Sequence, residues 1–304
     1  MSHSNTTPTQ NKSPKEIVPE SLIRILTYNI CMIPEYVPYI MGNNLIRANL
    51  ICNIIIDNIN NIDIICLQEL FDKNIKEYMV SRLSSYYPFY ILDNSSGKYW
   101  IGVNSGLAIF SKYIFYDPKL ITYNLYRGVA ESFANKGALC IRLRLATEYH
   151  HPDHENPNSD VYIINTHLQT DDYASDHWFL NLWGNTSLSP DDIRLEQIKQ
   201  LKNIISKHSI PLDRHIICGD FNIINPFYYN LMQNLIGIRD TFQRTDFIHQ
   251  HYSIPMHVNM SQTSNDNNRI DYILSNLPSC NSHITDDFLH HSDHHAVIAT
   301  LQCN

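Results

Sequence analysis

The sequence lacks several features that would narrow its function, and positive charge is the first. Its 304 residues contain 22 Lys and Arg against 30 Asp and Glu, for a formal net charge of −8, and no block of basic residues occurs. Proteins that hold nucleic acid mainly by neutralising its phosphates carry a basic stripe. The acidic balance therefore argues against a nucleic-acid partner, although a bound metal can supply positive charge locally.

Long apolar runs are also missing. No run approaches the roughly 20 residues that a transmembrane helix needs. The first twenty residues are rich in Ser, Thr, Asn, Gln and Pro and contain no apolar segment of the kind found in secretory signals. We therefore expect residues 1–20 to form a disordered tail, and we expect a cytoplasmic or peripheral membrane protein.

Paired cysteines are absent as well. The seven Cys residues occur singly, without a CxxC pair, and Cys66, Cys140 and Cys218 lie inside strand-like runs. Cysteines in such positions are usually buried small hydrophobes. An odd number of cysteines with this placement favours a reducing compartment over a disulfide framework.

The chain shows no internal repeat and no Gly/Ser linker that would divide it. Hydrophobic residues make up 43% of it and charged residues 17%, a composition typical of a soluble globular protein. We expect residues 21–304 to form one domain, and we expect a monomer. Short apolar runs predict strands over Ile23–Ile30, Ile62–Leu67, Gly106–Phe110, Ala138–Leu145, Val161–Asn165, His215–Cys218, Arg269–Leu274 and Ala296–Leu301.

Amphipathic stretches between these runs predict helices. Asn44–Asn60 has apolar residues in two rows spaced four apart, namely Ile46, Leu50, Ile54 and Ile51, Ile55, Ile59. Asp191 or Asp192 is expected to cap a second helix, which carries Ile193, Ile198, Leu201 and Ile205 inward. Buried strands with amphipathic helices imply a layered α/β protein. One sheet covered on both faces and two packed sheets between helices satisfy the pattern equally.

Polar residues cluster at or just beyond the ends of several predicted strands, where loops on a rigid scaffold usually carry function. Such positions are occupied by Asn29, Gln68-Glu69, Thr166–Gln169 and Gly219–Asn222, and the final strand is preceded by Ser292–His294. Each is unremarkable when taken alone, since a solvated strand end would account for it. A set of solvated strand ends does not account for all of them in this order.

The complete set resembles the endonuclease/exonuclease/phosphatase superfamily from Leu22 to Leu301. It consists of Asn29, Gln68-Glu69, His167, Gly219-Asp220-Phe221-Asn222, Arg269-Ile270-Asp271-Tyr272 and Ser292-Asp293-His294. The resemblance, and not the periodicity, implies a DNase I-like four-layered α/β sandwich, with two packed β-sheets flanked by helices and the site at one mouth.

Four further segments resemble neutral sphingomyelinases: Gln68–Asp72, Asn104–Ser111, Phe133–Ala138 and Thr166–Gln169. Inositol-polyphosphate phosphatases are expected to have a Trp before the Gly-Asp pair, where this chain has Ile217-Cys218. The resemblance therefore implies a phosphodiesterase that hydrolyses sphingomyelin to ceramide and phosphocholine.

Such hydrolysis needs a metal to spread charge on the phosphoryl oxygens, a base for water and an acid for the leaving alcohol. We expect Mg²⁺, with Mn²⁺ as the alternative, and oxygen ligands suit either ion. The resemblance implies the following roles. Glu69 is the direct metal ligand with Asn29 close by, and Asp293 joins the metal network. His294 is the general base and Asp271 orients it. His167 stabilises the pentavalent phosphorus and helps to protonate the leaving oxygen, while Asp220 and Asn222 position water and phosphate.

Two further segments can be interpreted in more than one way. Lys136 is expected in a mobile loop near the site, where it can pair with an acidic residue; Glu131 occupies that position, and a solvated loop lysine is the alternative. Trp178, Phe179 and Trp183 lie in an insertion after His167 and suit contact with a membrane sphingolipid, although a lid or core position fits them equally. Residues 33–41 are a second candidate for membrane contact.

Three other functions compete with this prediction. A DNase-like or abasic-site nuclease would share the metal and the histidines, but the acidic charge and the Phe133–Ala138 segment oppose it. A catalytically inactive binding protein is opposed by the presence of every expected site residue. Nothing in the sequence separates sphingomyelin from lysolipids or other choline phosphodiesters. Other histidines, at 150, 151, 154, 290 and 291, are expected to be solvated loop residues.

Overall fold

The computed structural model describes residues 22–34, 41–96, 103–144, 160–171, 186–207, 211–242 and 268–303. The predicted tail over residues 1–20, the aromatic segment around Trp178 and the histidines near residue 150 lie outside these ranges.

The strands form two sheets. The first has the order β10-β11-β1-β2-β4-β3, made of β1 (Leu22–Met32), β2 (Ile64–Leu70), β3 (Phe89–Leu92), β4 (Ala108–Ser111), β10 (Ser279–Thr285) and β11 (Ala296–Gln302). The second has the order β5-β6-β7-β8-β9, made of β5 (Phe115–Thr122), β6 (Gly137–Arg144), β7 (Asp160–His167), β8 (His215–Asp220) and β9 (Asp271–Ser275). The pairs β1/β2 and β7/β8 are parallel, and the other pairs of these strands are antiparallel.

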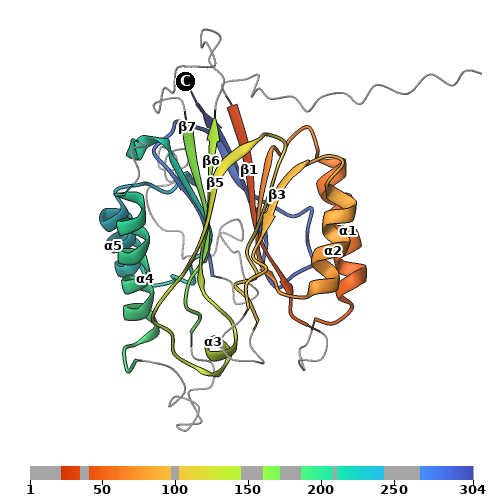
Figure 1. Ribbon diagram of the computed structural model, residues 1–304. Helices are drawn as coiled ribbons and strands as arrows, with labels where there is room; N and C mark the ends of the chain where they lie inside the picture. The colour runs from red at the N-terminus through yellow and green to blue at the C-terminus, as the bar shows by residue number, and fades with distance from the viewer. Residues whose placement is uncertain are drawn as a thin grey trace, which may run out of the picture.

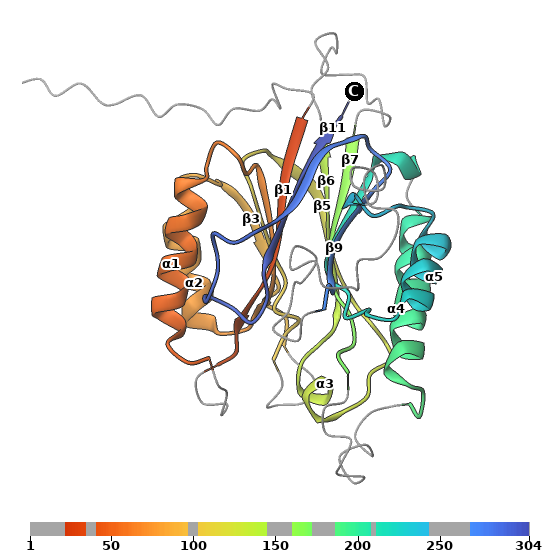
Figure 2. The same cartoon turned by 180° about the vertical axis from the view of Figure 1, so that it is seen from behind.

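Helices cover the outer face of each sheet (Figures 1 and 2). Helices α1 (Asn44–Asp57) and α2 (Lys73–Leu83) pack on the first sheet, and α4 (Pro190–Ile205) and α5 (Pro226–Ile236) pack on the second. The short helix α3 (Val129–Phe133) lies at one end of the sandwich, and a 3₁₀ turn, Leu212–Arg214, precedes β8. This arrangement confirms the predicted four-layered sandwich. No helix in the described ranges is both long and apolar enough to cross a membrane.

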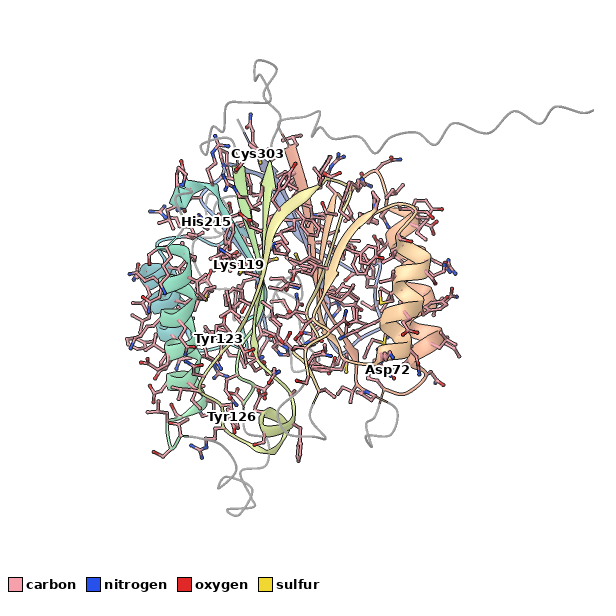
Figure 3. All side chains as sticks on the ribbon, viewed as in Figure 1. Asp72, Lys119, Tyr123, Tyr126, His215 and Cys303 are labelled. Carbon is pink, nitrogen blue, oxygen red and sulfur yellow. The ribbon has the colours of Figure 1, made fainter. Side chains whose placement is uncertain are left out.

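The core follows from the two-residue period of the strands. Ile25 and Cys66 face the space between the sheets, whereas Leu26 and Leu67 on the same two strands face the helices. Side chains fill both kinds of interlayer space (Figure 3). The prediction that the strand over Ile64–Leu67 is buried on both faces is confirmed, and so is the burial of the three strand cysteines.

Of the two apolar rows on α1, the row with Ile51 and Ile55 is buried, whereas Ile46 of the other row is 61% exposed. One detail of the helix predictions is wrong. The cap of α4 is Ser189, whose side chain accepts a hydrogen bond from the backbone N–H of Asp192. Ser189 is followed by Pro190 in the first turn, so the acidic residues lie within the turn and complement the helix dipole.

Several elements escaped prediction for identifiable reasons. β5 is an edge strand whose residues are mostly exposed, so it lacks a clear alternation. α2 and α5 are shorter than α1 and α4, yet both carry side-chain caps, from Asp72 and Asn225. Those caps, with Pro226 after Asn225 and Gly237 closing α5, were usable signals.

Gly219 lies where β8 passes so close to β7 that a side chain would not fit. Its φ is +139°, and a Cβ there would lie 1.9 Å from the Thr166 carbonyl oxygen. Gly219→Ala is expected to lower the free energy of unfolding by about 4 kcal/mol, because backbone would have to move. Gly42 also has positive φ but nothing within 4 Å, so Gly42→Ala should cost only about 1 kcal/mol. Urea unfolding of both variants tests this, and equal losses would contradict it.

Candidate active site

The ends of strands from both sheets meet at the end of the sandwich where α3 lies (Figure 1). Asn29 on β1 is paired in register with Gln68 on β2, directly before Glu69. In the second sheet His167 on β7 pairs with Asp220 on β8, which in turn pairs with Asp271 on β9. The two sheets pack face to face, and this packing brings together residues that are far apart in the sequence.

Asn29 links the carboxylates of the two sheets. Its Nδ2 donates to Oε1 of Glu69 at 3.1 Å and to Oδ2 of Asp220 at 3.0 Å, while its Oδ1 accepts from the backbone N–H of Cys31 at 3.1 Å. Glu69 has φ +57°, in the left-handed region that side chains other than glycine rarely adopt. Strained residues of this kind cluster at functional sites.

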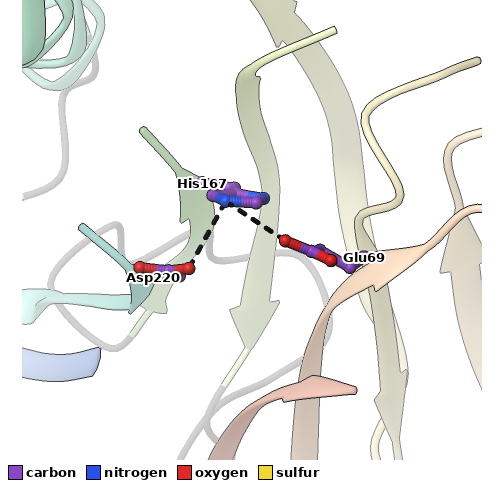
Figure 4. Close-up of side chains that lie close together, drawn as sticks. All are labelled: Glu69, His167 and Asp220. Carbon is purple, nitrogen blue, oxygen red and sulfur yellow. Dashed lines mark ion pairs between the residues drawn. The ribbon is translucent and has the colours of Figure 1, made fainter. Parts of the chain in front are cut away.

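His167 completes this group. Its Nε2 lies 3.4 Å from Oδ2 of Asp220 and 3.9 Å from Oε1 of Glu69, and the three side chains point toward one another (Figure 4). The ring is fully buried. Burial, together with the positive charges of Lys136 and His294, holds the pKa of His167 well below its ordinary value. The imidazole is therefore neutral.

Lys136 belongs to the site. It is 4% exposed, so the alternative of a solvated loop lysine is wrong. Its Nζ lies 2.6 Å from Nε2 of His167 and 3.3 Å from Oε1 of Glu131, which also accepts from Oγ1 of Thr170 at 2.8 Å. The acidic partner expected at position 131 is therefore present.

His294 is a second histidine close to Asp220. Its Nδ1 lies 2.7 Å from Oδ2 of Asp271, and its Nε2 lies 3.8 Å from Oδ2 of Asp220. Burial lowers the pKa of His294, but the carboxylates of Asp271, Asp220 and Asp293 outweigh it and raise the pKa to about 10. Asp271 thus pairs with His294 as the resemblance implied.

The remaining predicted residues lie around this core. The backbone N–H of Asn222 donates to Oδ1 of Asp220 at 3.0 Å, and its Nδ2 donates to the Leu168 carbonyl at 3.2 Å. Asp293 adjoins Ser292, a motif residue that received no role from the sequence. The Ser292 hydroxyl donates to the Asn29 carbonyl at 2.7 Å and accepts from the His294 N–H at 3.2 Å, so it ties two site segments together.

The acidic character of the site suits a hard cation. Burial, and then the neighbouring Asp271, raise the pKa of Asp220 to about 7, and burial also raises the pKa of Glu69. Among the described residues, two groups place their ligand atoms within 4.8 Å of one another: Glu69, His167, Asp220 and Asp220, Asp271, His294. Mg²⁺ and Mn²⁺ favour carboxylate oxygens, so the donor set fits such an ion.

Known proteins share this sequence pattern. Residues 26–294 match the Endonuclease/Exonuclease/phosphatase family. Sphingomyelinase C of Bacillus cereus is 26% identical over 215 residues, which cover 66% of this chain and 57% of that protein. Phospholipase C of Staphylococcus aureus is 24% identical over 228 residues, covering 70% of this chain and 61% of that protein. The chain thus spans less than two thirds of the length of these curated relatives.

Solved structures share the fold. The crystal structure of sphingomyelinase C from Streptomyces griseocarneus has a TM-score of 0.65 at 18% identity, covering 92% of this chain and 99% of that one. A variant of beta toxin from Staphylococcus aureus with bound magnesium ions has a TM-score of 0.62 at 18% identity, with the same coverage of 92% and 99%. Since the family match extends over most of the chain and the fold agrees, the protein belongs to the endonuclease/exonuclease/phosphatase family.

Proposed function

We propose that the protein is a Mg²⁺-dependent phosphodiesterase that hydrolyses sphingomyelin to ceramide and phosphocholine. The observation that carries the proposal is the His294–Asp271 pair, with Nδ1 2.7 Å from the carboxylate, beside a cluster of carboxylates joined by Asn29. Such a pair would serve as a general base next to a site for a hard cation. The choice of sphingomyelin is supported by the sphingomyelinase-like segments and by relatives named sphingomyelinase C.

Glu69 and Asp220 would hold the ion, because their carboxylates converge from the two sheets on one amide. Asn29 would keep the two carboxylates in place, and Asp293 would add negative charge from the neighbouring loop. When bound, the ion would supply positive charge that offsets these carboxylates, brings the pKa of His294 toward its ordinary range and polarises the phosphoryl oxygens.

His294 would take the proton of the attacking water at Nε2. Its Nδ1 faces Asp271, which fixes the tautomer and the ring plane. Nε2 is 3.8 Å from Oδ2 of Asp220, too far for a direct hydrogen bond, so one water molecule lying beside the two groups could bond to both in the reacting complex. His294 acts here as an acceptor that Asp271 has oriented.

His167 and Lys136 would act on the leaving oxygen. Nε2 of the neutral His167 ring lies 2.6 Å from the Lys136 ammonium and accepts from it. A proton that moves from Nζ to Nε2 would pass on to the ceramide oxygen, which leaves Lys136 neutral and returns the ring to its starting form. Glu131 holds Lys136 in place at 3.3 Å. Asn222, anchored to Asp220 and to the loop after His167, would orient the phosphate.

His294→Ala is expected to reduce phosphocholine release from sphingomyelin in mixed micelles with Mg²⁺ by about 10²–10⁴-fold, the usual contribution of a general base. His295→Ala is the matched control, since His295 is the adjacent ring and approaches the exposed Asp286, at 4.0 Å. Phosphatidylcholine and plasmid DNA serve as competing substrates. Nicking of plasmid without lipid turnover would overturn the substrate and favour a nuclease.

Metal binding can be measured without substrate. Mg²⁺ at a hundred times its Kd is expected to stabilise the folded protein by about 2.7 kcal/mol, because the ion binds the folded state alone. Glu69→Gln should abolish this stabilisation. Glu77→Gln, at a carboxylate that is 68% exposed and 3.9 Å from Lys73, should leave it intact. Thermal unfolding with Mg²⁺ or EDTA gives the comparison, and an equal shift in both variants would refute Glu69 as a ligand.

Contact with the lipid surface through Trp178, Phe179 and Trp183 stays a prediction, because these residues lie outside the described ranges. Replacing all three with Ala should weaken binding to sphingomyelin vesicles, since aromatic rings favour the bilayer interface. Hydrolysis of a short-chain, monomeric substrate should be unchanged. Loss of both activities together would indicate a core or lid position instead.

A further inference from the structure

A buried arginine outside the catalytic set connects several segments of the site. Arg47 on α1 is 6% exposed, and all five of its N–H donors are used. Nε donates to the carbonyl of Gly42 at 3.0 Å, Nη1 to the carbonyls of Ile30 at 3.0 Å and His291 at 2.8 Å, and Nη2 to the carbonyl of Cys31 at 2.7 Å and to Oδ1 of Asn44 at 2.8 Å. None of these five acceptors is a carboxylate.

These acceptors point to a role in geometry. A buried guanidinium is usually paired with an acid, and its N–H groups then donate hydrogen bonds to the carboxylate. Here the guanidinium instead binds backbone carbonyls at the end of β1, at Gly42 two residues before α1, and in the loop before His294, together with the side chain of Asn44. The guanidinium thus fixes the backbone of three separate segments.

One chain of hydrogen bonds connects Arg47 to the proposed metal ligands. Nη1 and Nη2 hold the carbonyls of Ile30 and Cys31, and Cys31 has φ +49°. In that conformation the Cys31 N–H donates to Oδ1 of Asn29 at 3.1 Å. This bond orients the Asn29 amide so that Nδ2 faces Glu69 and Asp220.

A second chain of hydrogen bonds connects Arg47 to the site residues near the C-terminus. Nη1 holds the His291 carbonyl, directly before Ser292. The Ser292 hydroxyl bonds the Asn29 carbonyl at 2.7 Å and the His294 N–H at 3.2 Å. The same guanidinium therefore fixes the backbone on both sides of the Asn29–Ser292 contact.

We infer that Arg47 is a positioning residue, which holds Asn29 and the Ser292–His294 segment in register and so sets the affinity of the site for Mg²⁺. The inference rests on the proposed function in that it takes the Glu69–Asp220 cluster as the metal site. Residues that orient metal ligands typically change metal affinity or activity by about 10–100-fold when replaced. The five bonds of Arg47 reach backbone carbonyls and one amide oxygen, so its effect on the ion would pass through Asn29 and Ser292.

A role through charge alone, or through stability alone, predicts a different result. If only the positive charge of Arg47 matters, Arg47→Lys should behave as the wild type, because lysine keeps the charge and loses the planar fork of N–H donors. If Arg47 matters only for stability, removal of another anchoring arginine near β1 should have the same effect. Arg24 is that control: it lies on β1 five residues before Asn29 and donates to the buried Asp63 at 2.8 Å and to the Asn60 carbonyl.

The test is the Kd for Mg²⁺, measured by calorimetry on the wild type, Arg47→Lys, Arg47→Met and Arg24→Met, at a temperature where unfolding curves show each variant folded. Both Arg47 variants should raise the Kd about 10–100-fold, and Arg24→Met should lower the Tm without changing the Kd. Asn44→Ala, which removes one acceptor of the fork, should raise the Kd by less and serves as the gentler variant if the Arg47 variants do not fold.

The outcomes separate the inference from the proposed function. Three results would each overturn the positioning role. The first is a wild-type Kd for Arg47→Lys, and the second is a change of Kd in Arg24→Met equal to that in the Arg47 variants. The third, which applies if the Arg47 variants do not fold, is an unchanged Kd in Asn44→Ala. Absence of Mg²⁺ binding in the wild type would overturn the metal site itself. Binding that depends on Arg47 in a protein that does not cleave sphingomyelin would keep the positioning role and overturn only the substrate.

Discussion

The close approach of buried carboxylates from two different sheets is the constraint on which the site depends. Glu69 and Asp220 accept from one amide, at 3.1 and 3.0 Å, although β2 and β8 belong to separate sheets. Burial disfavours the charge of each carboxylate, and like charges nearby add to the cost. The pKa of both groups is raised accordingly. Such a cluster persists because Asn29 donates to both acids and the cations of Lys136 and His294 stand close to them.

The interleaved core supplies the rigidity that this arrangement needs. Alternating side chains of β1, β2, β7 and β8 fill the space between the sheets, and the opposite faces pack on helices. Backbone strain is concentrated at the site end of these strands, where Cys31, Glu69 and Asn222 all have positive φ. Positions of this kind persist only where the surrounding structure over-determines them. The hydrogen bonds of Asn29, Ser292 and Arg47 perform that function at β1.

Sequence patterns predicted the buried strands well because two-sided burial leaves continuous apolar runs such as Ile64–Leu67. They could not choose between one sheet and two, and the family resemblance made that choice. The exposed edge strand β5 left no periodic signal. Lys136 could not be recognised as buried, because a lysine enters the interior only when partners such as Glu131 and His167 are close in space. Arg47 left a usable signal, since it continues the buried row of Ile51 and Ile55 at a spacing of four.

The two site histidines differ in their surroundings, and the difference supports separate roles. His167 lies against an ammonium and is neutral because its pKa is lowered, whereas His294 lies against Asp271 and its pKa is raised to about 10. The positive charge of a bound ion would bring the pKa of His294 back toward its ordinary range, so that the ring could accept a proton. Groups whose environments drive their pKa values apart are the ones suited to opposite halves of acid–base chemistry. His294 is paired on Nδ1 and leaves Nε2 for water, which fits a base.

His167 is coupled to the Lys136 ammonium on the same nitrogen that approaches Asp220 and Glu69, which fits delivery of a proton to the leaving oxygen. Both rings approach the same oxygen, since Oδ2 of Asp220 lies 3.4 Å from Nε2 of His167 and 3.8 Å from Nε2 of His294. The packing of the two sheets therefore sets both histidines against one carboxylate. A phosphate that Asp220 helps to position would therefore lie near both histidine rings.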